Sequence, residues 1–406
     1  MYAVGIDVSK GRSTVAVLEP LGKTVAKPFE VRHTKSGMND LVNYLNTLDG
    51  ECRIVLEHTG RYYEPMVRWL SGAGLFVSAV NPKLIRDFDN NSLRRVKTDK
   101  ADAKKIGRFA LDKWYMLRQY TAMDNIRTQL KTMNRQMSFY QKQQTAYKNN
   151  LIALMDETYP GANKFFTSPK RPDGSEKWVD FIEKFWHVDC VCNISLKSFT
   201  EKYQKWCKKH GYIFQPDKPV EIYNASKELI PILAKDDMTK LFVQQAVTQL
   251  NAISKAVEEL RQQMDSLASQ LPEYPAVMSM FGIGTTLGPQ LIAEIGDVHK
   301  FTKRSQLTAF AGVDPGVNES GDYAQKSVHT TKHGSPYLRK TLFLIMNVLI
   351  QNQPEDDPVY RFMAKKRDEG KPYYVYMTAG ANKFLRIYFG KVGKVKEYLS
   401  NLPLEE

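Results

Sequence analysis

The chain has 406 residues, and 58 Lys and Arg against 44 Asp and Glu give it a formal net charge of +14. A hydrophobic content of 42% and a charged content of 25% are typical of globular proteins and argue against disorder. The apolar runs are shorter than the ~20 residues of a membrane span, the N-terminus lacks a secretory signal, and four cysteines make no disulfide scaffold. We expect a soluble, cytoplasmic, nucleoid-associated protein of two or three domains, with no membrane partner, whose basicity suits nucleic acid.

Residues 1–118 have the pattern of an α/β domain. Three β-rich runs are separated by short turns, which implies antiparallel hairpins. Two further short strands alternate with helices, and this order predicts a mixed sheet with helical cover. The expected strands are 2–8, 13–18, 24–31, 53–57 and 75–80, and the expected helices are 37–48, 62–72 and 99–111.

Residues 119–271 contain two long heptad patterns, and Gln144 occupies one skipped apolar position. We expect two coiled-coil helices paired as an antiparallel hairpin, with an insertion at about 157–236 at its tip. Pairing with copies from another subunit and plain amphipathic helices of a bundle are the alternatives. The first pattern is Ile126, Leu130, Met133, Met137, Tyr140, Tyr147, Leu151 and Leu154, and the second is Ala246, Leu250, Ile253, Val257, Leu260, Met264, Leu267 and Leu271.

Residues 272–406 are expected to form a mainly helical domain, with helices near 336–351, 359–367 and 374–398. A glycine turn containing Gly282 and Gly284 precedes the apolar segment 287–295, and Gly296 follows it. This order resembles half of a helix-hairpin-helix element, in which backbone N–H groups at a helix start hold a phosphate. On this pattern the two glycines are candidates for nucleic-acid binding. Glycine turns are common in proteins, so the pattern alone is of moderate specificity.

Four carboxylates in the N-terminal domain have a pattern that suits metal-dependent phosphodiester chemistry. Asp7 and Glu57 stand at the ends of two expected strands, and Asp99 and Asp102 share one face of a helix start. Hard Mg²⁺ takes oxygen ligands, and clustered carboxylates need such a cation to offset their repulsion. Bringing them together is the ribonuclease-H-like arrangement. The alternatives are a turn-forming Asp7 and two aspartates that serve a helix cap and dipole.

Basic residues flank the aspartate pair and recur in the C-terminal domain. We expect them to contact phosphates, and a solvated helix face is the alternative. The nucleic-acid candidates are Arg94, Arg95, Lys97, Lys100, Lys104 and Lys105 near the aspartates, and Lys326, Lys332, Arg339 and Lys340 near the C-terminus.

Three N-terminal segments resemble the DEDD domain of the transposase family named after insertion sequence 110, whose members are bridge-RNA-guided recombinases. These segments are Gly5-Ile6-Asp7-Val8-Ser9-Lys10, Leu56-Glu57-His58-Thr59-Gly60 and Lys97-Thr98-Asp99-Lys100-Ala101-Asp102-Ala103. The resemblance implies a RuvC-like domain in which Asp7, Glu57, Asp99 and Asp102 hold Mg²⁺, as two ions for which Mn²⁺ can substitute.

A second resemblance places a nucleophile in the C-terminal domain. The segments Phe281-Gly282-Ile283-Gly284, Glu294-Ile295-Gly296-Asp297, Ala311-Gly312-Val313-Asp314-Pro315 and Asn318-Glu319-Ser320-Gly321 are similar to the family's C-terminal transposase domain. By this resemblance Ser320 attacks DNA and forms a covalent phosphoserine. A free serine hydroxyl is a poor nucleophile, so this chemistry needs a base or a metal nearby. The family's composite site joins the carboxylates of one subunit to the serine of another.

The resemblance implies a DNA transposase acting as a site-specific recombinase on donor and target DNA, guided by a bridge RNA and assembled as a dimer or tetramer. A DNA invertase of the same family is one alternative. A Holliday-junction resolvase-like nuclease that uses water instead of serine is another, and a catalytically silent nucleic-acid-binding protein is a third.

The insertion contains a possible zinc knuckle formed by His187, Cys190, Cys207 and His210, with Cys192 nearby. The spacing within each pair suits Zn²⁺. The alternative, which we favour, is that these cysteines are small core residues beside Trp186 and Trp206.

Overall fold

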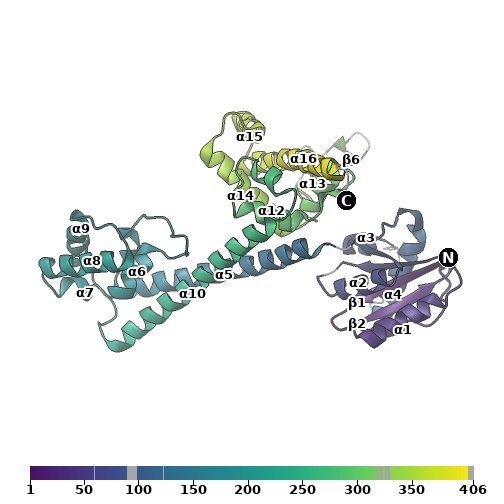
Figure 1. Ribbon diagram of the computed structural model, residues 1–406, viewed down its shortest axis with the longest axis horizontal. Helices are drawn as coiled ribbons and strands as arrows, with labels where there is room; N and C mark the ends of the chain where they lie inside the picture. The colour runs from purple at the N-terminus through teal and green to yellow at the C-terminus, as the bar shows by residue number, and fades with distance from the viewer. Residues whose placement is uncertain are drawn as a thin grey trace, which may run out of the picture. The chain divides into compact units, whose positions relative to one another are not determined.

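The computed structural model describes residues 1–58, 60–88, 98–121, 123–315, 319–320, 323–324 and 330–400 (Figure 1). The chain divides into two compact units, Met1–Ala122 and Met123–Glu406. The first unit is built on a mixed sheet, and the second is mainly helical. The architecture is therefore α/β plus α, as the sequence predicted.

The first unit contains a five-stranded sheet in the order β3-β2-β1-β4-β5. The pairs β1–β2 and β2–β3 are antiparallel, whereas β1–β4 and β4–β5 are parallel, so the predicted mixed sheet is confirmed. The strands are β1 (Tyr2–Val8), β2 (Arg12–Leu18), β3 (Phe29–Arg32), β4 (Cys52–Glu57) and β5 (Phe76–Val80).

The third strand is shorter than the predicted range 24–31. Only an isolated bridge joins Thr24 to Leu18, and β3 itself begins at Phe29. A short 3₁₀ turn (η1, Pro20–Gly22) follows β2, and Leu21 within it has a φ of 67°. Pro28 has no N–H to give to a ladder, which explains why pairing starts only after it.

Helices cover both faces of this sheet. Valines, isoleucines and a leucine on one face of the sheet pack with α1 and α2, and Ala3, Val55 and Val80 on the other face pack with α3 and α4. This division follows from the alternation of side chains along each strand. The helices are α1 (Lys35–Asn46), α2 (Glu64–Gly72), α3 (Pro82–Asp87) and α4 (Asp99–Asp112).

Two long helices, α5 (Asn125–Thr158) and α10 (Asp237–Ala268), lie side by side in the second unit (Figure 1). They are antiparallel: Arg127 near the start of α5 bonds Glu273 just beyond α10, and Gln144 bonds Ser254 midway. At the other end, the backbone N–H of Leu233 donates to the Glu157 carbonyl. The two heptad segments therefore form an antiparallel helical pair, while its coiled-coil geometry stays a prediction.

The chain between the two long helices folds around an aromatic core that includes Phe181, Phe199 and Tyr203. Four helices in this segment contribute to the core. The helices are α6 (Lys177–Lys184), α7 (Asp189–Cys192), α8 (Leu196–His210) and α9 (Asp217–Lys227).

The C-terminal part of the second unit packs its helices around one apolar core that includes Leu291, Leu342 and Phe384. Its elements are α11 (Tyr274–Met278), α12 (Leu287–Ile295), α13 (Arg304–Ala311), β6 (Glu319–Ser320), β7 (Tyr323–Ala324), α14 (Pro336–Asn352), α15 (Pro358–Asp368) and α16 (Tyr373–Ser400). In the described part of the chain, no helix combines the length and apolar character needed to cross a membrane. We propose that this part, from residue 272, is a separate domain from the helical pair.

Candidate active site

Asp7 and Glu57 lie near the carboxyl ends of the neighbouring strands β1 and β4. Ile6 and Leu56 are paired in the parallel β1–β4 ladder, and both side chains lie in the core beneath α1 and α2. Because side chains alternate along a strand, Asp7 and Glu57 point to the opposite face, which α4 covers. Both carboxylates are half-buried.

The helix α4 lies directly on β1 because both elements carry a glycine at their contact. A Cβ atom at Gly5 would overlap the Ala103 carbonyl oxygen and the backbone nitrogen of Gly107. A Cβ atom at Gly107 would come within 2.8 Å of Leu18 Cδ1. The two glycines therefore allow a backbone-to-backbone approach that other residues would prevent.

The direction of α4 brings its first turn towards Asp7. Arg53, near the start of β4, donates to the Trp114 carbonyl just beyond the end of α4, so α4 runs against β1 and β4. The beginning of α4, with Asp99 and Asp102, consequently lies towards the carboxyl ends of these strands. Thr98 supplies the helix cap by accepting from the Ala101 N–H at 3.2 Å.

Asp7 lies within electrostatic range of the other three carboxylates. Burial, followed by the negative charges of Asp102, Asp99 and Glu57, raises the pKa of Asp7 to about 6. Each of these causes disfavours the charged form of Asp7. A cation held between these groups would offset the repulsion that raises the Asp7 pKa.

The donor set fits a hard divalent cation, because all four side chains offer carboxylate oxygens, the ligands that Mg²⁺ prefers. Among the described residues, no three His, Cys, Asp or Glu side chains already form a metal-holding group.

Basic side chains accompany α4. Lys100 is exposed, and Lys104 and Lys105 are half-buried. Lys105 Nζ also donates to the Arg86 carbonyl at 3.1 Å, which ties α4 to the end of α3. The predicted phosphate contacts Arg94, Arg95 and Lys97 lie outside the described residues.

Ser320 lies at the end of a small β-hairpin. In the backbone ladder, Glu319 pairs with Ala324 and Ser320 pairs with Tyr323, so only residues 321 and 322 connect the two strands. Pro315 forms an isolated bridge with Thr330 further down the same two arms. The chain therefore reverses direction directly after Ser320, and Ser320 is the last paired residue of the first strand of this hairpin.

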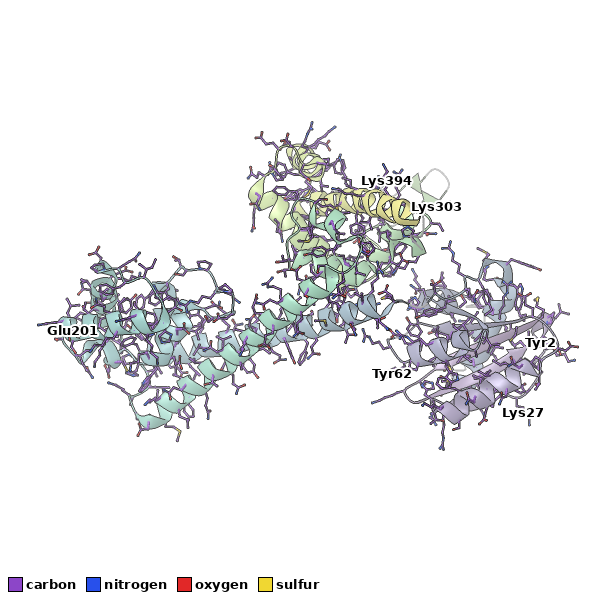
Figure 2. The ribbon with its side chains drawn as sticks, in the orientation of Figure 1. Tyr2, Lys27, Tyr62, Glu201, Lys303 and Lys394 are labelled. Atoms are coloured by element: carbon purple, nitrogen blue, oxygen red, sulfur yellow. The ribbon has the colours of Figure 1, made fainter. Side chains whose placement is uncertain are left out.

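The C-terminal basic candidates have different environments. Lys332 and Lys340 are exposed, as are Lys303 and Lys394, which are labelled in Figure 2. Arg339 is half-buried, and one terminal nitrogen donates to the carbonyls of Ala311 and Gly334 at 3.0 Å each. These contacts give Arg339 a structural role between the two carbonyls, and its phosphate contact stays a prediction. Lys326 lies outside the described residues.

The glycine turn before α12 is partly packed. Gly282 has a φ of 82° and lies against Ile345, whereas Gly284 has open space where a side chain would be. No side chain caps α12 at Thr286. The helix-hairpin-helix interpretation and the phosphate contacts of the two glycines stay predictions.

The zinc-knuckle residues make other contacts. Buried His187 donates from Nε2 to the Leu233 carbonyl at 3.0 Å and accepts at Nδ1 from the Asp189 N–H at 3.1 Å. His210 stacks on Tyr212, and Cys207 is buried in the aromatic core. No metal-holding group of three occurs here within the described chain. These contacts support the core interpretation over zinc.

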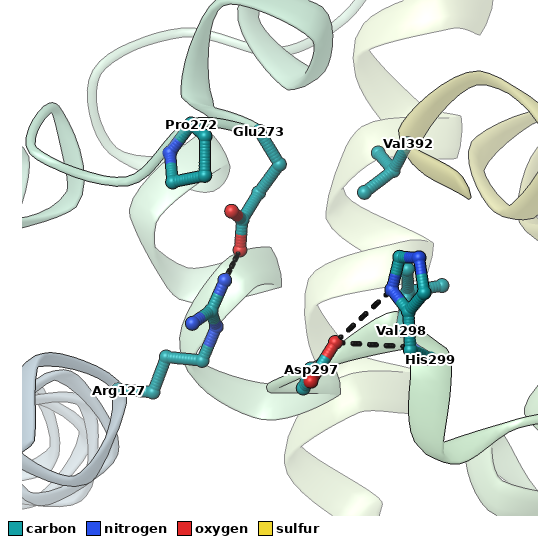
Figure 3. Close-up of a pocket in the computed structure, with 7 residues that line it drawn as sticks. All are labelled: Arg127, Pro272, Glu273, Asp297, Val298, His299 and Val392. Atoms are coloured by element: carbon teal, nitrogen blue, oxygen red, sulfur yellow. Dashed lines mark hydrogen bonds and ion pairs between the residues drawn. The ribbon is translucent and has the colours of Figure 1, made fainter. Parts of the chain in front are cut away.

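A small cavity lies where the two long helices meet the C-terminal helices (Figure 3). Arg127 pairs there with both Asp124 and Glu273, and the His299 Nδ1 atom lies 3.3 Å from Asp297. The cavity is lined by Arg127, Pro272, Glu273, Asp297, Val298, His299 and Val392. Because Arg127 is committed to two carboxylates, we interpret this network as a structural anchor for α5.

Sequence reasoning missed the glycines that seat α4 and the buried carboxylate of Glu294. Gly5 was visible as a glycine inside a strand, a signal of close backbone approach. Gly107 stands inside a helix, where glycine is unfavourable unless packing requires it. Glu294 is the one charged residue in the sequence of α12 and is only 2% exposed.

Comparison with known proteins agrees with this architecture at both ends of the chain. Residues 4–160 match the IS110-type DEDD transposase model, and residues 274–361 match the transposase IS116/IS110/IS902 family. The chain is also 22% identical to a pilin gene-inverting protein of Moraxella bovis, over 84% of this chain and 79% of that protein. A pilin gene-inverting protein of Moraxella lacunata matches with the same identity and coverage.

These matches indicate a DNA-recombining protein of the transposase class, whose substrate is DNA. More particularly, the chain belongs to the IS110 family of transposases.

Proposed function

We propose that this protein is a site-specific DNA recombinase that cuts and rejoins DNA through a phosphoserine at Ser320. The observation that carries the proposal is geometric: the parallel pairing of β1 with β4 sets Asp7 beside Glu57, and α4 lies against β1 with Asp99 and Asp102 in its first turn. Burial, followed by the charges of these three carboxylates, raises the pKa of Asp7, which supports the grouping. The family match at residues 4–160 includes these four carboxylates, and the match at residues 274–361 includes Ser320.

The four carboxylates would hold Mg²⁺, in two ions, and Mn²⁺ could substitute. The metal would supply Lewis-acid stabilisation of charge on the phosphodiester oxygens. The chain's own contribution is to orient the carboxylate oxygens that would hold the metal. The strands β1 and β4 fix Asp7 and Glu57, and α4 fixes the aspartate pair.

In the proposed reaction, the Ser320 Oγ–phosphorus bond forms while one phosphorus–oxygen bond of the DNA backbone breaks. The serine proton passes to a base, and the leaving deoxyribose oxygen gains a proton to become a hydroxyl. The reverse attack by a hydroxyl of another strand restores Ser320 and joins the strands. Bond energy is conserved in the phosphoserine, so the exchange needs no ATP.

We further propose that the carboxylates of one copy act with Ser320 of another, in a dimer or tetramer that spans donor and target DNA. A bridge RNA that pairs with both DNA molecules would select the sites. The oligomer and the RNA rest on the family resemblance alone.

The test is covalent capture. Purified protein, Mg²⁺, element-end DNA, target DNA and RNA from the element's noncoding end are incubated and then denatured. We expect a protein–DNA adduct that is lost in both Ser320→Ala and Asp7→Ala. Cleavage without an adduct, retained in Ser320→Ala but lost in Asp7→Ala, would overturn the serine mechanism and favour a resolvase-like nuclease.

A DNA invertase is the second candidate, because both similar proteins are named for inverting a pilin gene. Inversion and transposition differ in the arrangement of sites and not in the proposed chemistry. A plasmid with two inverted sites distinguishes them: an invertase flips the intervening segment, whereas a transposase moves it to a separate target molecule.

A further inference from the structure

The two arms of the chain that lead to and from Ser320 are joined at their base. The Ser335 N–H donates to the Phe310 carbonyl at 2.8 Å, and the Lys332 N–H donates to the Gly312 carbonyl at 3.2 Å. Thr331 bonds Asp314 twice, through its backbone at 3.1 Å and its hydroxyl at 2.6 Å. Residues 310–314, at the end of α13, are therefore hydrogen-bonded to residues 331–335, before α14, and we call these two joined segments the hairpin base.

Glycine makes this joint possible. A Cβ atom at Gly334 would overlap the Phe310 carbonyl oxygen and lie 2.5 Å from the Gly312 nitrogen. Arg339 from α14 reaches back and bonds carbonyls on both arms, at Ala311 and Gly334. Backbone contact and one shared arginine hold the arms together.

A buried carboxylate fixes one arm to the rest of the unit. Glu294 accepts hydrogen bonds from Asn134 Nδ2 at 2.7 Å, Arg135 at 2.9 Å and Ser335 Oγ at 3.1 Å. The same Ser335 oxygen accepts from the Leu338 N–H at 3.2 Å, so it also caps α14. Glu294 thus connects α5, α12 and the start of α14 at the hairpin base.

We propose that Glu294 is a positioning residue for Ser320. It holds Ser335, and thereby sets the direction in which the hairpin base leaves the helical core. A buried carboxylate is a poor way to gain stability, because removing it from water costs more than a well-packed apolar residue would. Three donors converging from two helices suit orientation, since a charged acceptor fixes direction as well as distance. This inference rests on the proposed function of Ser320.

Variants at Ser335 separate positioning from simple capping. Ser335→Thr keeps both the cap and the hydroxyl donor, whereas Ser335→Asp keeps a good cap but places a second carboxylate against Glu294. We expect Ser335→Thr to form the DNA adduct at the normal rate. We expect Ser335→Asp to form it about 10- to 100-fold more slowly, because small misplacement of a reacting group is costly.

DNA affinity and melting temperature are measured alongside the adduct rate. A positioning role predicts that DNA affinity changes little in Ser335→Asp, at a temperature where the variant is still folded, while the single-turnover rate falls. If Ser335→Asp matches the wild type in rate, the serine acts only as a cap and the proposal is overturned. Equal losses of affinity, stability and rate would also overturn it, because they indicate a purely structural role.

A charge relocation provides the second variant, should Ser335→Asp fold poorly. Glu294→Gln keeps the shape of the side chain but weakens its acceptor, and we expect the adduct rate to fall with DNA binding retained. Combining Glu294→Gln with Ser335→Asp moves the carboxylate across the contact and restores a donor–acceptor pair. We expect the double variant to react faster than either single variant. Independent, additive losses would contradict the proposed link.

Failure of this inference and failure of the proposed function give different results. If Ser320 is not the nucleophile, the wild-type protein forms no adduct that depends on Ser320. If it is the nucleophile but Glu294 does not position it, the adduct forms in wild type and in Glu294→Gln at equal rates.

Discussion

At the scale of single residues, Asp7 combines an unfavourable environment for its charge with a proposed role in metal binding. Its carboxylate is held beside three others, and its pKa is raised from 3.8 to about 6. Raising an acid's pKa means that the folded state binds the proton more tightly than the unfolded state. The stability that follows is present below pH 4 and is lost as the pH rises through about 6.

We predict that Asp7→Asn increases stability at neutral pH while abolishing cleavage. The difference between pKa values of 3.8 and about 6 corresponds to about 3 kcal/mol, and solvent screening reduces the expected gain to about 1–2 kcal/mol. Urea unfolding in the presence of a chelator measures it. The gain should appear at pH 7.5 and vanish near pH 4. Asp40→Asn, at an exposed position on α1, is the control and should show no such gain.

At the scale of elements, the site depends on how closely α4 approaches β1. The proposed metal binding by the four carboxylates would need Asp102 near Asp7, and the contact between Gly5 and Gly107 sets how closely α4 approaches β1. Side chains there would push the helix outwards. The glycines therefore act on the site through the position of a whole helix.

We predict that Gly5→Ala destabilises the protein by about 1–3 kcal/mol, as overpacking does, and lowers DNA cleavage at saturating Mg²⁺. The matched control is Gly72→Ala, at an exposed helix position with no atom near the added Cβ. Calorimetry and a cleavage assay test both variants. An active, fully stable Gly5→Ala protein would show that the close approach is not needed.

The pair of long helices contains a polar contact in its apolar seam. Gln144 Nε2 donates to the buried hydroxyl of Ser254 at 2.8 Å. We predict that Ser254→Ala costs about 1 kcal/mol because the amide loses its partner, whereas Gln144→Leu with Ser254→Ala is neutral or stabilising. Thermal unfolding of the two variants measures the difference. A double variant less stable than Ser254→Ala would show that the polar pair is needed for the packing.

At the scale of the whole molecule, each unit has its own apolar interior. The two clusters that line the sheet belong to residues before Ala122, and the remaining two clusters belong to the helical unit. Compact units with separate cores generally fold independently.

We predict that residues 1–122 fold when produced alone. The expected result is a cooperative thermal transition in circular dichroism, with mixed α/β signal. Residues 123–406, produced separately, should also unfold cooperatively. A fragment 1–122 without a transition would mean that the helical unit is needed to complete the sheet.

Features with local periodicity were predictable from the sequence. The two long helices were predicted because apolar residues repeat many times at helical spacing, so the helical conformation can be inferred from each segment alone. The alternation in β1 and β4 similarly placed Asp7 and Glu57 at strand ends. The range 24–31 was overextended because one proline and one turn, and not a repeated pattern, decide where β3 begins.

The sequence by itself determined the charge balance and predicted the mixed sheet and the two long helices, because these depend on composition and on repeating patterns within short segments. Only the tertiary structure decided that Gly5 meets Gly107, that Arg339 is committed to two carbonyls, and that Glu294 joins Asn134 to Ser335. These are single contacts between residues far apart in sequence. Such contacts leave no repeating pattern, since they arise from how whole helices and strands pack.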